Sequence, residues 1–395
     1  MMIALKKGLQ NLLLAAISLS LALVALEVLC RIVAEPVDFL RPRLIDDPVL
    51  GHVIEPGSGG HDAWGFRNRS VPASADIVTI GDSQTYGVSA TARDAWPSVL
   101  AQLSGQNVYN LALGGYGPLQ YLHLLTTKAV TLNPGLVIVG FYFGNDLLDA
   151  YSMGHDNPHL AALKKSQLEP DNAAARATSA DAAETPLPWL ADLRSWLAQR
   201  SVVYNMLIHS AIGEAARSAE AVLVETGEDA VRYDRNGIAA GFTPARRLKA
   251  LNLEDPQVRE GLEIALDVFA RMKTFCVEHA LGFLVVLIPT KEGVYAQYVK
   301  NDPDLGTMPA IQALLANERR VRARVTSFFE EHGIAHVDPL PELQQRVAAL
   351  PLYPGNFDGH PNRNGYRIIA ETVDRYLEQL APHAAASPGS PGVLE

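Results

Sequence analysis

Five short apolar segments follow one another along the chain from residue 77 onward, and turns rich in glycine and polar residues end them. Their aliphatic and β-branched composition is typical of short buried strands. Stretches with apolar residues at helical spacing lie between them, near residues 95–103, 119–130, 256–279, 309–332 and 366–380. The five predicted strands are Ile77–Ile80, Asn107–Leu113, Gly135–Phe143, Gly282–Ile288 and Ile334–Val337.

This alternation of strands and helices predicts an α/β fold, a three-layer α/β/α sandwich around a five-stranded parallel sheet. Right-handed crossovers bring the carboxyl ends of all the strands to one edge of such a sheet. The residues Ser83, Gly115, Asn145 and Lys291 each follow a different predicted strand. We therefore expect these four residues at the same rim.

The regular alternation stops between residues 150 and 253, which we interpret as a mainly helical insertion. An Ala-rich polar stretch at 171–185 is expected to be disordered. Short helices are expected near 188–198 and 202–217. An Asn-Gly dipeptide predicts a tight hairpin at 231–242.

The N-terminus has the pattern of a membrane anchor. Lys6 and Lys7 precede an uncharged, apolar run from Gly8 to Leu26, which is close to the roughly 20 residues that span a bilayer. This length favours an uncleaved signal anchor over a cleaved signal peptide, for which Ile32-Val33-Ala34 is a weak cleavage site. The two lysines place the N-terminus in the cytoplasm and the rest of the chain in the periplasm or outside the cell.

The predicted organisation therefore has four parts. Residues 1–34 form the cytoplasmic N-terminus and transmembrane helix, and residues 35–75 form a stalk and covering segment. Residues 76–380 form the main domain, with the insertion at 150–253. Residues 381–395 are Ala-, Pro-, Gly- and Ser-rich and are expected to be a disordered tail.

Composition excludes several functions. The net charge is −10 and the chain has no dense Lys/Arg block, which argues against nucleic-acid binding. The two cysteines, Cys30 and Cys276, lie far apart, and no Cys/His spacing typical of zinc ligands occurs. We expect no metal, no nucleotide and no other cofactor.

The candidate chemistry starts at Ser83, directly after the first strand. A serine hydroxyl needs a neighbouring base, usually histidine, and a third group that orients the base. Among eleven histidines, His360 is distinctive because it lies in a Gly/Pro-rich loop after the last strand, two residues after Asp358. A solvated turn is the alternative interpretation of that loop taken alone.

Acyl transfer also needs hydrogen-bond donors for the oxyanion that develops on the carbonyl oxygen. The backbone N–H groups of Ser83 and Gly115 and the side-chain amide of Asn145 are candidates. Each residue also has an ordinary interpretation on its own, as a turn glycine or a helix N-cap. The convergence of several strand ends favours the functional interpretation.

Four short motifs resemble the sequence blocks of the SGNH hydrolases, the GDSL esterase/lipase superfamily. They occur in the family's order and cover about residues 75–380 apart from the insertion. The resemblance implies a flavodoxin-like sheet of the SGNH type, with Ser83 as nucleophile, His360 as base and Asp358 as its partner. It also implies that Gly115 and Asn145 are oxyanion donors. The motifs are Gly81-Asp82-Ser83, Asn110 with Gly115, Gly144-Asn145-Asp146 and Asp358-Gly359-His360.

The sequence departs from the family pattern at two places. Many members have the acid three residues before the histidine, where this chain has Phe357; the two-residue spacing occurs in the alginate acetylation branch of the superfamily. The serine motif reads GDSQ, without the leucine that names the GDSL group. Thr85 also replaces the second glycine of G-x-S-x-G, which argues against an α/β-hydrolase elbow.

The segment Pro289-Thr290-Lys291-Glu292 resembles part of the periplasmic polysaccharide O-acetylation proteins of the same superfamily. Lys291 is therefore expected either to contact an anionic substrate or to brace the loop through Glu292, and Asp82 and Glu292 are further candidate substrate contacts. A surface salt bridge between Lys291 and Glu292 is the competing interpretation, and such pairs are common.

These features predict a membrane-anchored serine esterase that acts on an acyl ester, with an acylated polysaccharide as one candidate substrate. The first alternative is a polysaccharide O-acetyltransferase that uses the same residues, with the insertion as a lid that excludes water. The second alternative is a catalytically silent binding or scaffold protein of the cell envelope. The expected partners are the ester substrate, the bilayer and an envelope acylation complex.

Overall fold

A computed structural model describes residues 2–161, 188–208, 230–235 and 237–384. The chain divides into two compact units. The first comprises Met1–Ile45, Ile54–Gly65 and Ala173–Glu225, and the second comprises Asp46–Val53, Phe66–Asn172 and Thr226–Glu395. Residues 171–185, for which disorder was predicted, lie outside the described residues, and so does most of the predicted tail.

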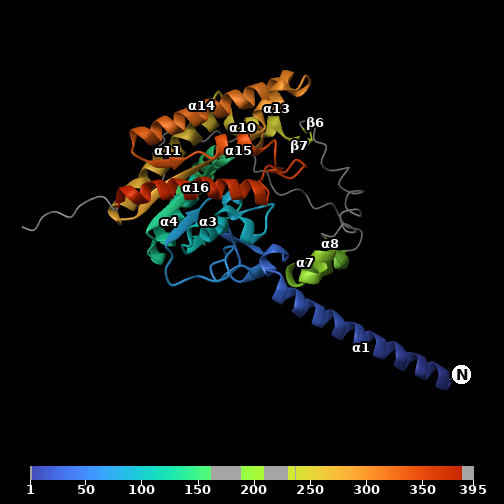
Figure 1. The fold of residues 1–395 in the computed structure, drawn as a ribbon. Coiled ribbons are helices and arrows are strands. Elements are labelled where there is room, and N and C mark those ends of the chain that lie inside the picture. The colour runs from blue at the N-terminus through green and yellow to red at the C-terminus, as the bar shows by residue number, and fades with distance from the viewer. Residues whose placement is uncertain (1, 162–187, 209–229, 236, 385–395) are drawn as a thin grey trace, which may run out of the picture. The chain divides into compact units, whose positions relative to one another are not determined.

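The second unit is built on a five-stranded parallel sheet (Figure 1). Its strand order is β4-β3-β5-β8-β9, the order of a flavodoxin-like sheet. The predicted fold class is confirmed. The strands are β3 (Ile77–Ile80), β4 (Val108–Asn110), β5 (Leu136–Tyr142), β8 (Gly282–Ile288) and β9 (Ala335–Val337).

The strand β4 is shorter than the apolar run that predicted it. The chain nevertheless stays beside β3, because the N–H of Leu111 donates to Thr79 O at 2.8 Å and that of Leu113 to Gly81 O at 3.2 Å. These two bonds lead the chain from the sheet into the glycine loop that follows Leu113. The carboxyl ends of β3 and β4 are therefore held side by side.

One face of the sheet is covered by four helices. Phe141 of β5 packs against Phe269 of α11, which in turn packs against Phe329 of α14, with ring centroids 5.0 and 5.4 Å apart. The helix α5 also packs on α11 and was not predicted, because its region was assigned to the insertion. The four helices are α4 (Pro118–Thr127), α5 (Asp146–Asp156), α11 (Pro256–Glu278) and α14 (Pro309–Glu331).

The other face is covered chiefly by α3 (Trp96–Ser104) and α16 (Arg363–Ala384), which contact each other. Ile138 of β5 belongs to the same buried cluster as Trp96 of α3 and Ile369 of α16. The short helix α15 (Leu340–Arg346) joins this layer and contacts α16. Because helices cover both faces, the sheet is buried and its strands are apolar on both sides.

The described part of the insertion includes a hairpin and a helix near the carboxyl edge of the sheet. The antiparallel strands β6 (Val231–Arg235) and β7 (Ile238–Phe242) confirm the predicted hairpin. Helix α10 of the insertion and two helices that follow β8 were not predicted because they are short. They are α10 (Pro244–Leu251), α12 (Lys291–Val294) and α13 (Ala296–Asn301).

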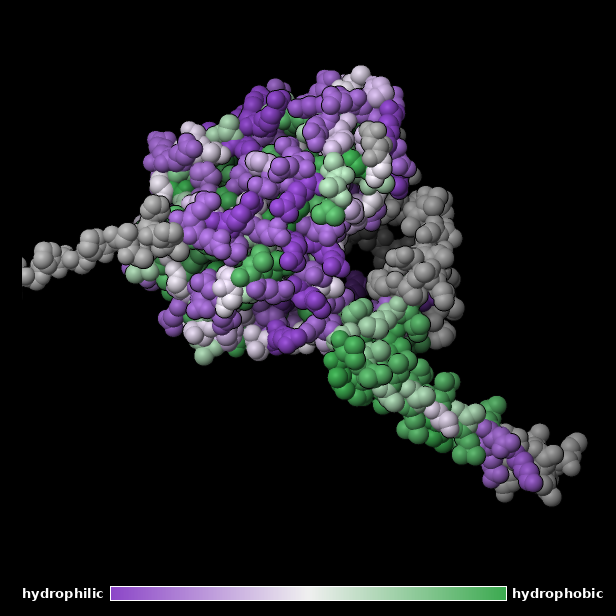
Figure 2. Space-filling model, viewed as in Figure 1, coloured by the Kyte–Doolittle hydropathy of each residue, from purple (hydrophilic) through white to green (hydrophobic). Residues whose placement is uncertain are grey.

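The first unit contains the N-terminal helix α1 (Met2–Val33), α7 (Pro188–Arg200) and α8 (Val202–Ile208). Over Gln10–Val33, α1 has a mean hydropathy of 2.5 and no fully buried residue, so its length and composition suit a membrane span or a signal sequence. Figure 2 shows the continuous apolar surface of this helix. The segment predicted as a stalk also holds two unpredicted short strands, β1 (Leu44–Asp47) and β2 (Gly51–Ile54).

Within this unit, the Glu27 carboxylate of α1 caps the N-terminus of α8. It accepts hydrogen bonds from the N–H groups of Val202 at 2.9 Å and Val203 at 3.1 Å, and from Ser201 Oγ at 2.9 Å. A carboxylate at a helix N-terminus satisfies donors that have no partner inside the helix. The acidic residue at the end of the apolar run thus ties α1 to the insertion.

Candidate active site

Ser83 lies where the sequence predicted it, immediately beyond β3 and at the first position of the short helix α2 (Ser83–Tyr86). Asp82 is the N-cap of this helix, and its Oδ1 accepts the N–H of Gln84 at 2.9 Å. The turn needs glycine at position 81, since a Cβ there would lie 2.3 Å from Thr85 Oγ1. The close packing of this turn aims the first residue of α2 at the rim of the sheet.

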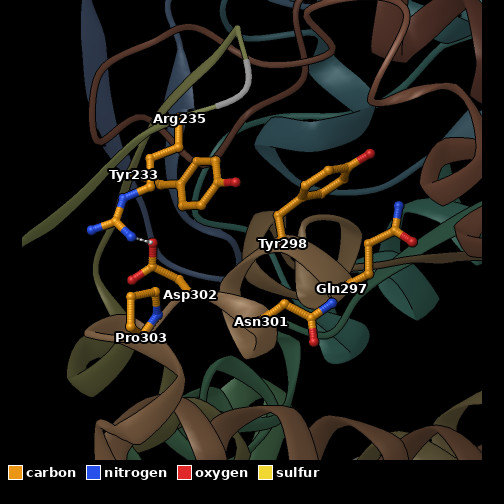
Figure 3. A pocket seen from close by; sticks show the side chains of 7 residues that line it. All are labelled: Tyr233, Arg235, Gln297, Tyr298, Asn301, Asp302 and Pro303. Atoms are coloured by element: carbon orange, nitrogen blue, oxygen red, sulfur yellow. Dashed lines mark ion pairs between the residues drawn. The ribbon is translucent and has the colours of Figure 1, made fainter.

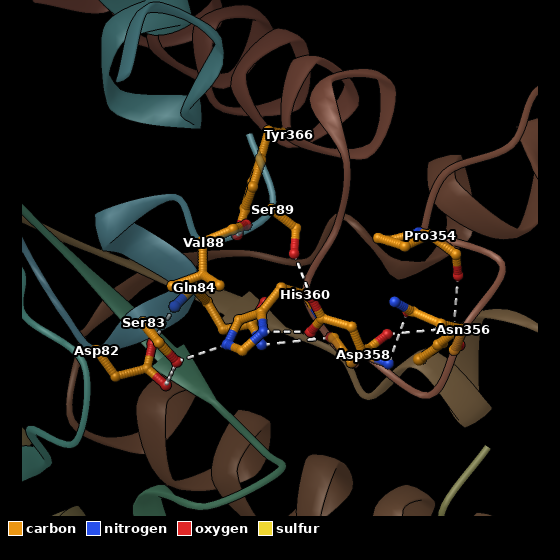
Figure 4. A network of polar contacts seen from close by, with 12 residues as sticks. Asp82, Ser83, Gln84, Val88, Ser89, Pro354, Asn356, Asp358, His360 and Tyr366 are labelled. Carbon is orange, nitrogen blue, oxygen red and sulfur yellow. Dashed lines mark hydrogen bonds and ion pairs between the residues drawn. The ribbon is translucent and has the colours of Figure 1, made fainter. Parts of the chain in front are cut away.

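The structure brings Ser83, His360 and Asp358 together in one hydrogen-bonded chain (Figure 4). His360 Nε2 lies 2.8 Å from Ser83 Oγ, and His360 Nδ1 lies 2.5 Å from Asp358 Oδ1. With a proton on Nδ1, the imidazole donates to the carboxylate and accepts the serine hydroxyl. The two-residue spacing between acid and histidine therefore permits a complete triad geometry.

Asp358 is held as a carboxylate. Partial burial raises its pKa, but hydrogen bonds from His360 and Ser89 outweigh that effect and lower the pKa to about 2. Ser89 Oγ donates to Asp358 Oδ2, the oxygen that His360 does not use. Ser89 has a φ of 67°, in the left-handed region, and its role was not predicted.

Lys291 has a different place from the predicted one. Its side chain is 1% exposed, and Nζ donates to three backbone carbonyls: Pro354 at 2.9 Å, Asn356 at 2.8 Å and Asp358 at 3.2 Å. The prediction of a substrate contact is therefore wrong for this residue, and so is the alternative of a surface salt bridge. Lys291 instead holds the loop that carries Asp358. Burial lowers its pKa to about 8.

Asp82 and Glu292 are also buried, with side chains 0% and 3% exposed. Glu292 Oε1 accepts the N–H of Thr243 at 3.1 Å, which connects it to the start of α10. Burial raises the pKa of Asp82 to about 6, against hydrogen bonds from Gln84, Asn145 and Ser83. Both acids are structural supports beneath the site, and the structure corrects their prediction as substrate contacts.

The glycine loop after β4 lies against the candidate nucleophile. A Cβ at Gly114 would be 3.6 Å from Ser83 Cβ, and Gly115 has a φ of 80°, which favours glycine. Within the described part of the chain, neither the Ser83 N–H nor the Gly115 N–H has a hydrogen-bond acceptor. Two free donors beside a serine hydroxyl suit the developing charge of a carbonyl oxygen.

Asn145 is the N-cap residue of α5, yet its side chain makes no capping bond. The turn that carries it is held by the neighbouring Asp146, whose Oδ2 accepts the N–H of Tyr142 and whose Oδ1 accepts Tyr121 Oη, both at 2.9 Å. Burial raises the pKa of Asp146 well above its ordinary value. The side-chain amide of Asn145 is therefore not used by its own helix and instead hydrogen-bonds Asp82 at the rim.

Two residues of the covering segment, Arg67 and Asn68, form hydrogen bonds with the backbone next to the site. The Arg67 guanidinium donates to the carbonyls of Gly87 at 2.8 Å and Ala90 at 3.0 Å, just beyond α2. Asn68 bonds the backbone of Asn110 in both directions, at 2.9 and 3.0 Å. The sequence predicted a covering segment over residues 35–75 but assigned no role to either residue.

His52, in the covering segment, contacts the glycine loop. Its Nε2 lies 2.9 Å from Gly114 O, and a Cβ at Gly115 would lie 3.3 Å from its Cε1. Tyr116 Oη donates to the backbone carbonyl of His52 at 2.8 Å. These contacts position the loop that carries one candidate oxyanion donor.

The insertion supplies Arg247, a partly buried cation that the sequence did not single out. Its guanidinium lies beside Gly359, the residue that separates Asp358 from His360. A Cβ at position 359 would be 2.4 Å from Arg247 Nη2. Its Cζ also lies 5.7 Å from the centre of the Tyr142 ring. The hairpin reaches the same loop, since the N–H of Gly241 donates to Asn356 O at 3.2 Å.

A separate pocket of about 360 Å³ lies between the hairpin and α13 (Figure 3). Arg235 at its edge is paired with Asp302 at 3.2 Å and with Asp304 at 2.9 Å. None of the triad residues lines this pocket. Among the residues that the structure describes, no cluster of three or more His, Cys, Asp or Glu could hold a metal ion.

No family model matches the sequence, and no curated protein matches it. Solved structures match over most of their own length but at low identity. A lipolytic protein of the G-D-S-L family from Desulfitobacterium hafniense is 14% identical, with 76% of this chain and 97% of that chain covered and a TM-score of 0.37. A GDSL-like lipase from Bacteroides thetaiotaomicron is 13% identical, with coverages of 77% and 88% and a TM-score of 0.34.

A variant of an acetylxylan esterase from Geobacillus stearothermophilus is 11% identical, with 77% of this chain and 94% of that chain covered and a TM-score of 0.36. Similarities at this level assign no activity. The functional proposal rests on the geometry of the site.

Proposed function

We propose that this chain is an SGNH-type serine esterase that hydrolyses acyl esters through an acyl-enzyme. The observation that carries the proposal is the continuous hydrogen-bonded chain Ser83–His360–Asp358, with a Ser83 Oγ to His360 Nε2 distance of 2.8 Å. A silent scaffold protein has no need for an acid-oriented histidine on a serine hydroxyl. The assembled triad therefore favours an enzyme over the scaffold alternative.

The cycle follows from the positions of these groups. Ser83 Oγ attacks the ester carbonyl while His360 Nε2 takes its proton, and the Asp358 carboxylate stabilises the imidazolium. The free N–H groups of Ser83 and Gly115, with the Asn145 amide, donate to the oxyanion. His360 then protonates the leaving alcohol, and water attacks the acyl-enzyme with His360 again as base.

The test is hydrolysis of a small acetyl ester by the full-length protein in detergent. Ser83→Ala should lower kcat by about a thousand-fold or more, whereas the exposed Ser70→Ala should leave it unchanged. Retention of most of the rate by Ser83→Ala would disprove the nucleophile assignment. Absence of turnover by every protein over esters of increasing chain length would favour the scaffold alternative.

An O-acetyltransferase is the second candidate, because the hairpin and α10 of the insertion reach the loop that carries Asp358. However, the side chains of His360 and Asp358 are 22% and 26% exposed, so water has access to the triad. That access favours hydrolysis. Acetylated glycan as the main product when a polysaccharide is added, in place of free acetate, would establish the transferase.

The cellular location of the enzyme is also a proposal. The apolar surface of α1 and the lysines near its start support an anchor whose catalytic unit faces the periplasm or cell exterior. An acylated polysaccharide and an envelope acylation complex are the proposed partners there. Digestion of the catalytic unit by added protease in intact cells would support an exterior location. Digestion only after the outer layers are opened, with the inner membrane intact, would support a periplasmic one.

A further inference from the structure

We infer that Arg247 forms an anion-binding subsite beside the triad, so that the preferred ester carries a carboxylate or phosphate near the acyl group. This inference rests on the proposed esterase function and names the substrate class of the same site. Arg247 is not itself predicted by any family motif in the sequence. It comes from the insertion, whose described part meets the loop between Asp358 and His360.

The first observation is position. Gly359 separates Asp358 from His360, and the Arg247 guanidinium lies so close to it that a Cβ at position 359 would be 2.4 Å from Nη2 and 3.3 Å from Cζ. The guanidinium therefore lies against the residue that joins Asp358 to His360. A charged group at that position can contact a substrate whose ester is at Ser83.

The second observation is that the guanidinium is unused. Within the part of the chain that the structure describes, no hydrogen bond or ion pair joins it to another residue, and its recorded contact is the 5.7 Å approach to the Tyr142 ring. Guanidinium has five N–H donors in a planar fork. Partial burial removes water from those donors, so a ligand that supplies oxygen acceptors is favoured.

The third observation is that two of the neighbouring cations, Lys291 and Arg67, already have hydrogen-bond partners. Lys291 Nζ donates hydrogen bonds to three backbone carbonyls, and the Arg67 guanidinium donates to the carbonyls after α2. Among the described residues, Arg247 therefore remains available to a substrate, as does the exposed Arg232, whose Cζ lies 4.8 Å from the centre of the Phe357 ring on the loop that carries the triad acid. The planar fork of Arg247 matches the two oxygens of a carboxylate or phosphate, which a lysine ammonium does not.

A purely structural role is the competing explanation. Asp82, Glu292 and Asp358 lie near enough to act on Arg247 electrostatically, and a cation there would offset their charge. Such a brace would affect all substrates equally. An anion subsite would instead affect charged esters more than neutral ones, so the two roles differ in substrate selectivity.

The experiment compares three mono-acetylated sugars with the same acetyl position: a neutral glucoside, a glucuronoside and a glucoside 6-phosphate. The full-length protein should hydrolyse one anionic ester with higher kcat/KM than the neutral ester. Arg247→Gln should lower that anionic-to-neutral ratio by about 10- to 100-fold, the effect of charge-assisted hydrogen bonds. Arg246→Gln, an exposed neighbour on α10, should keep the wild-type ratio.

Direct binding separates the subsite from the catalytic step. The Ser83→Ala protein, which leaves the ester intact, should bind the preferred anionic ester at least ten-fold more tightly than Ser83→Ala with Arg247→Gln. The carboxylate and phosphate arms show which anion is the better ligand. Thermal unfolding of each variant checks that it folds, and Arg247→Lys should restore part of the selectivity.

Equal losses of kcat/KM on charged and neutral esters in Arg247→Gln would establish the structural brace and overturn the subsite. A wild-type enzyme with no preference for either anion would overturn it as well. Hydrolysis of the neutral ester that depends on Ser83, without charge selectivity, would leave the esterase proposal standing while this inference fails. Absence of hydrolysis of all three esters would instead count against the esterase proposal.

Discussion

Lys291 shows how a single buried residue can shape this site without touching a substrate. Its ammonium has three N–H donors, and all three are used by carbonyls of the loop 354–358. The carboxylate of Asp358 keeps its direction because its own backbone is fixed in this way. Shifts of about 1 Å in such groups can cost about a hundred-fold in rate.

Replacement of Lys291 by Met should therefore lower kcat about 10- to 100-fold, because the loop that orients His360 loses its three donors. The measurement is steady-state kinetics on a neutral acetyl ester, with thermal unfolding in parallel. Lys300→Met, an exposed lysine on α13, is the matched control and should keep its activity. A normal kcat in folded Lys291→Met would show that the loop does not need this cation.

The pKa of Lys291, about 8, adds an expectation for alkaline solution. As the pH rises through this value, the amine loses one N–H, and one of the three carbonyls loses its donor. The kcat of the wild-type enzyme should therefore fall above about pH 8. A pH profile of Lys291→Met should lack this alkaline decline, and persistence of the same decline would assign it to another group.

Asp82 supplies a test on stability. Because its folded pKa is about 6 and the ordinary value is 3.8, the folded state holds a proton that the unfolded state releases between these pH values. The contribution of Asp82 to folding is therefore present below about pH 4 and is lost as the pH rises to about 6, a change of about 3 kcal/mol.

In Asp82→Asn this part of the pH dependence should disappear, and urea unfolding between pH 4 and pH 7 measures it. The exposed Asp234→Asn is the control and should follow the wild-type curve. Identical slopes for wild type and Asp82→Asn would mean that Asp82 titrates normally.

At the scale of elements, the loops after the strands carry the candidate catalytic residues, and the helices that follow two of these loops hold them in place. The turn after β3 becomes α2, the turn after β5 becomes α5, and the loop after β4 is tied by its first residues to β3. The glycine loop has the least regular structure of the three. Its conformation depends on glycine at position 115, where φ is 80°.

Gly115→Ala and Gly105→Ala should both lower the free energy of unfolding by about 1–2 kcal/mol, because both glycines have positive φ. A Cβ at Gly105, which ends α3, meets no atom within 4 Å, whereas a Cβ at Gly115 would press on His52. Only Gly115→Ala should lose kcat, by about 10- to 100-fold, since one oxyanion donor moves. Equal kcat values in the two variants would remove the Gly115 N–H from the oxyanion hole.

At the scale of the whole chain, the apolar helix α1 is the basis of the proposed membrane location. Leu19 and Leu23 of this helix are exposed, as a lipid-facing surface requires. A full-length protein anchored by α1 should stay with membranes after an alkaline wash. A cleaved signal peptide would instead yield a released protein whose N-terminus, read by mass spectrometry, lies beyond α1.

The double variant Leu19→Arg with Leu23→Arg should fail to stay with membranes, because each arginine costs about 2.5–3.5 kcal/mol in the middle of a membrane helix. Leu350→Arg, which changes an exposed leucine of the other unit, is the matched control and should stay with the membrane. Retention of the double variant would show that α1 is not the anchor.

Much of the fold follows from local pattern, since buried parallel strands are continuously apolar and their helices have a 3.6-residue period. The runs Ile77–Ile80 and Gly282–Ile288 coincide with β3 and β8 for this reason. The short helices α2, α10, α12 and α13 were not predicted because each contains too few residues to show the 3.6-residue period of apolar positions. Helix α5 was not predicted because most of its residues lie in the segment assigned to the insertion, which was expected to begin at residue 150.

The sequence by itself selected Ser83, Asp358, His360, Gly115 and Asn145 as candidates, because parallel strand ends share one rim and the motifs appear in order. The tertiary structure alone decided what Lys291 contacts, where Arg247 lies and which residues brace the loops. Those facts depend on burial and on backbone carbonyls brought together from distant segments. Such groups leave no local pattern in the sequence, because every residue has the same carbonyl and only folding determines which ones meet a charge.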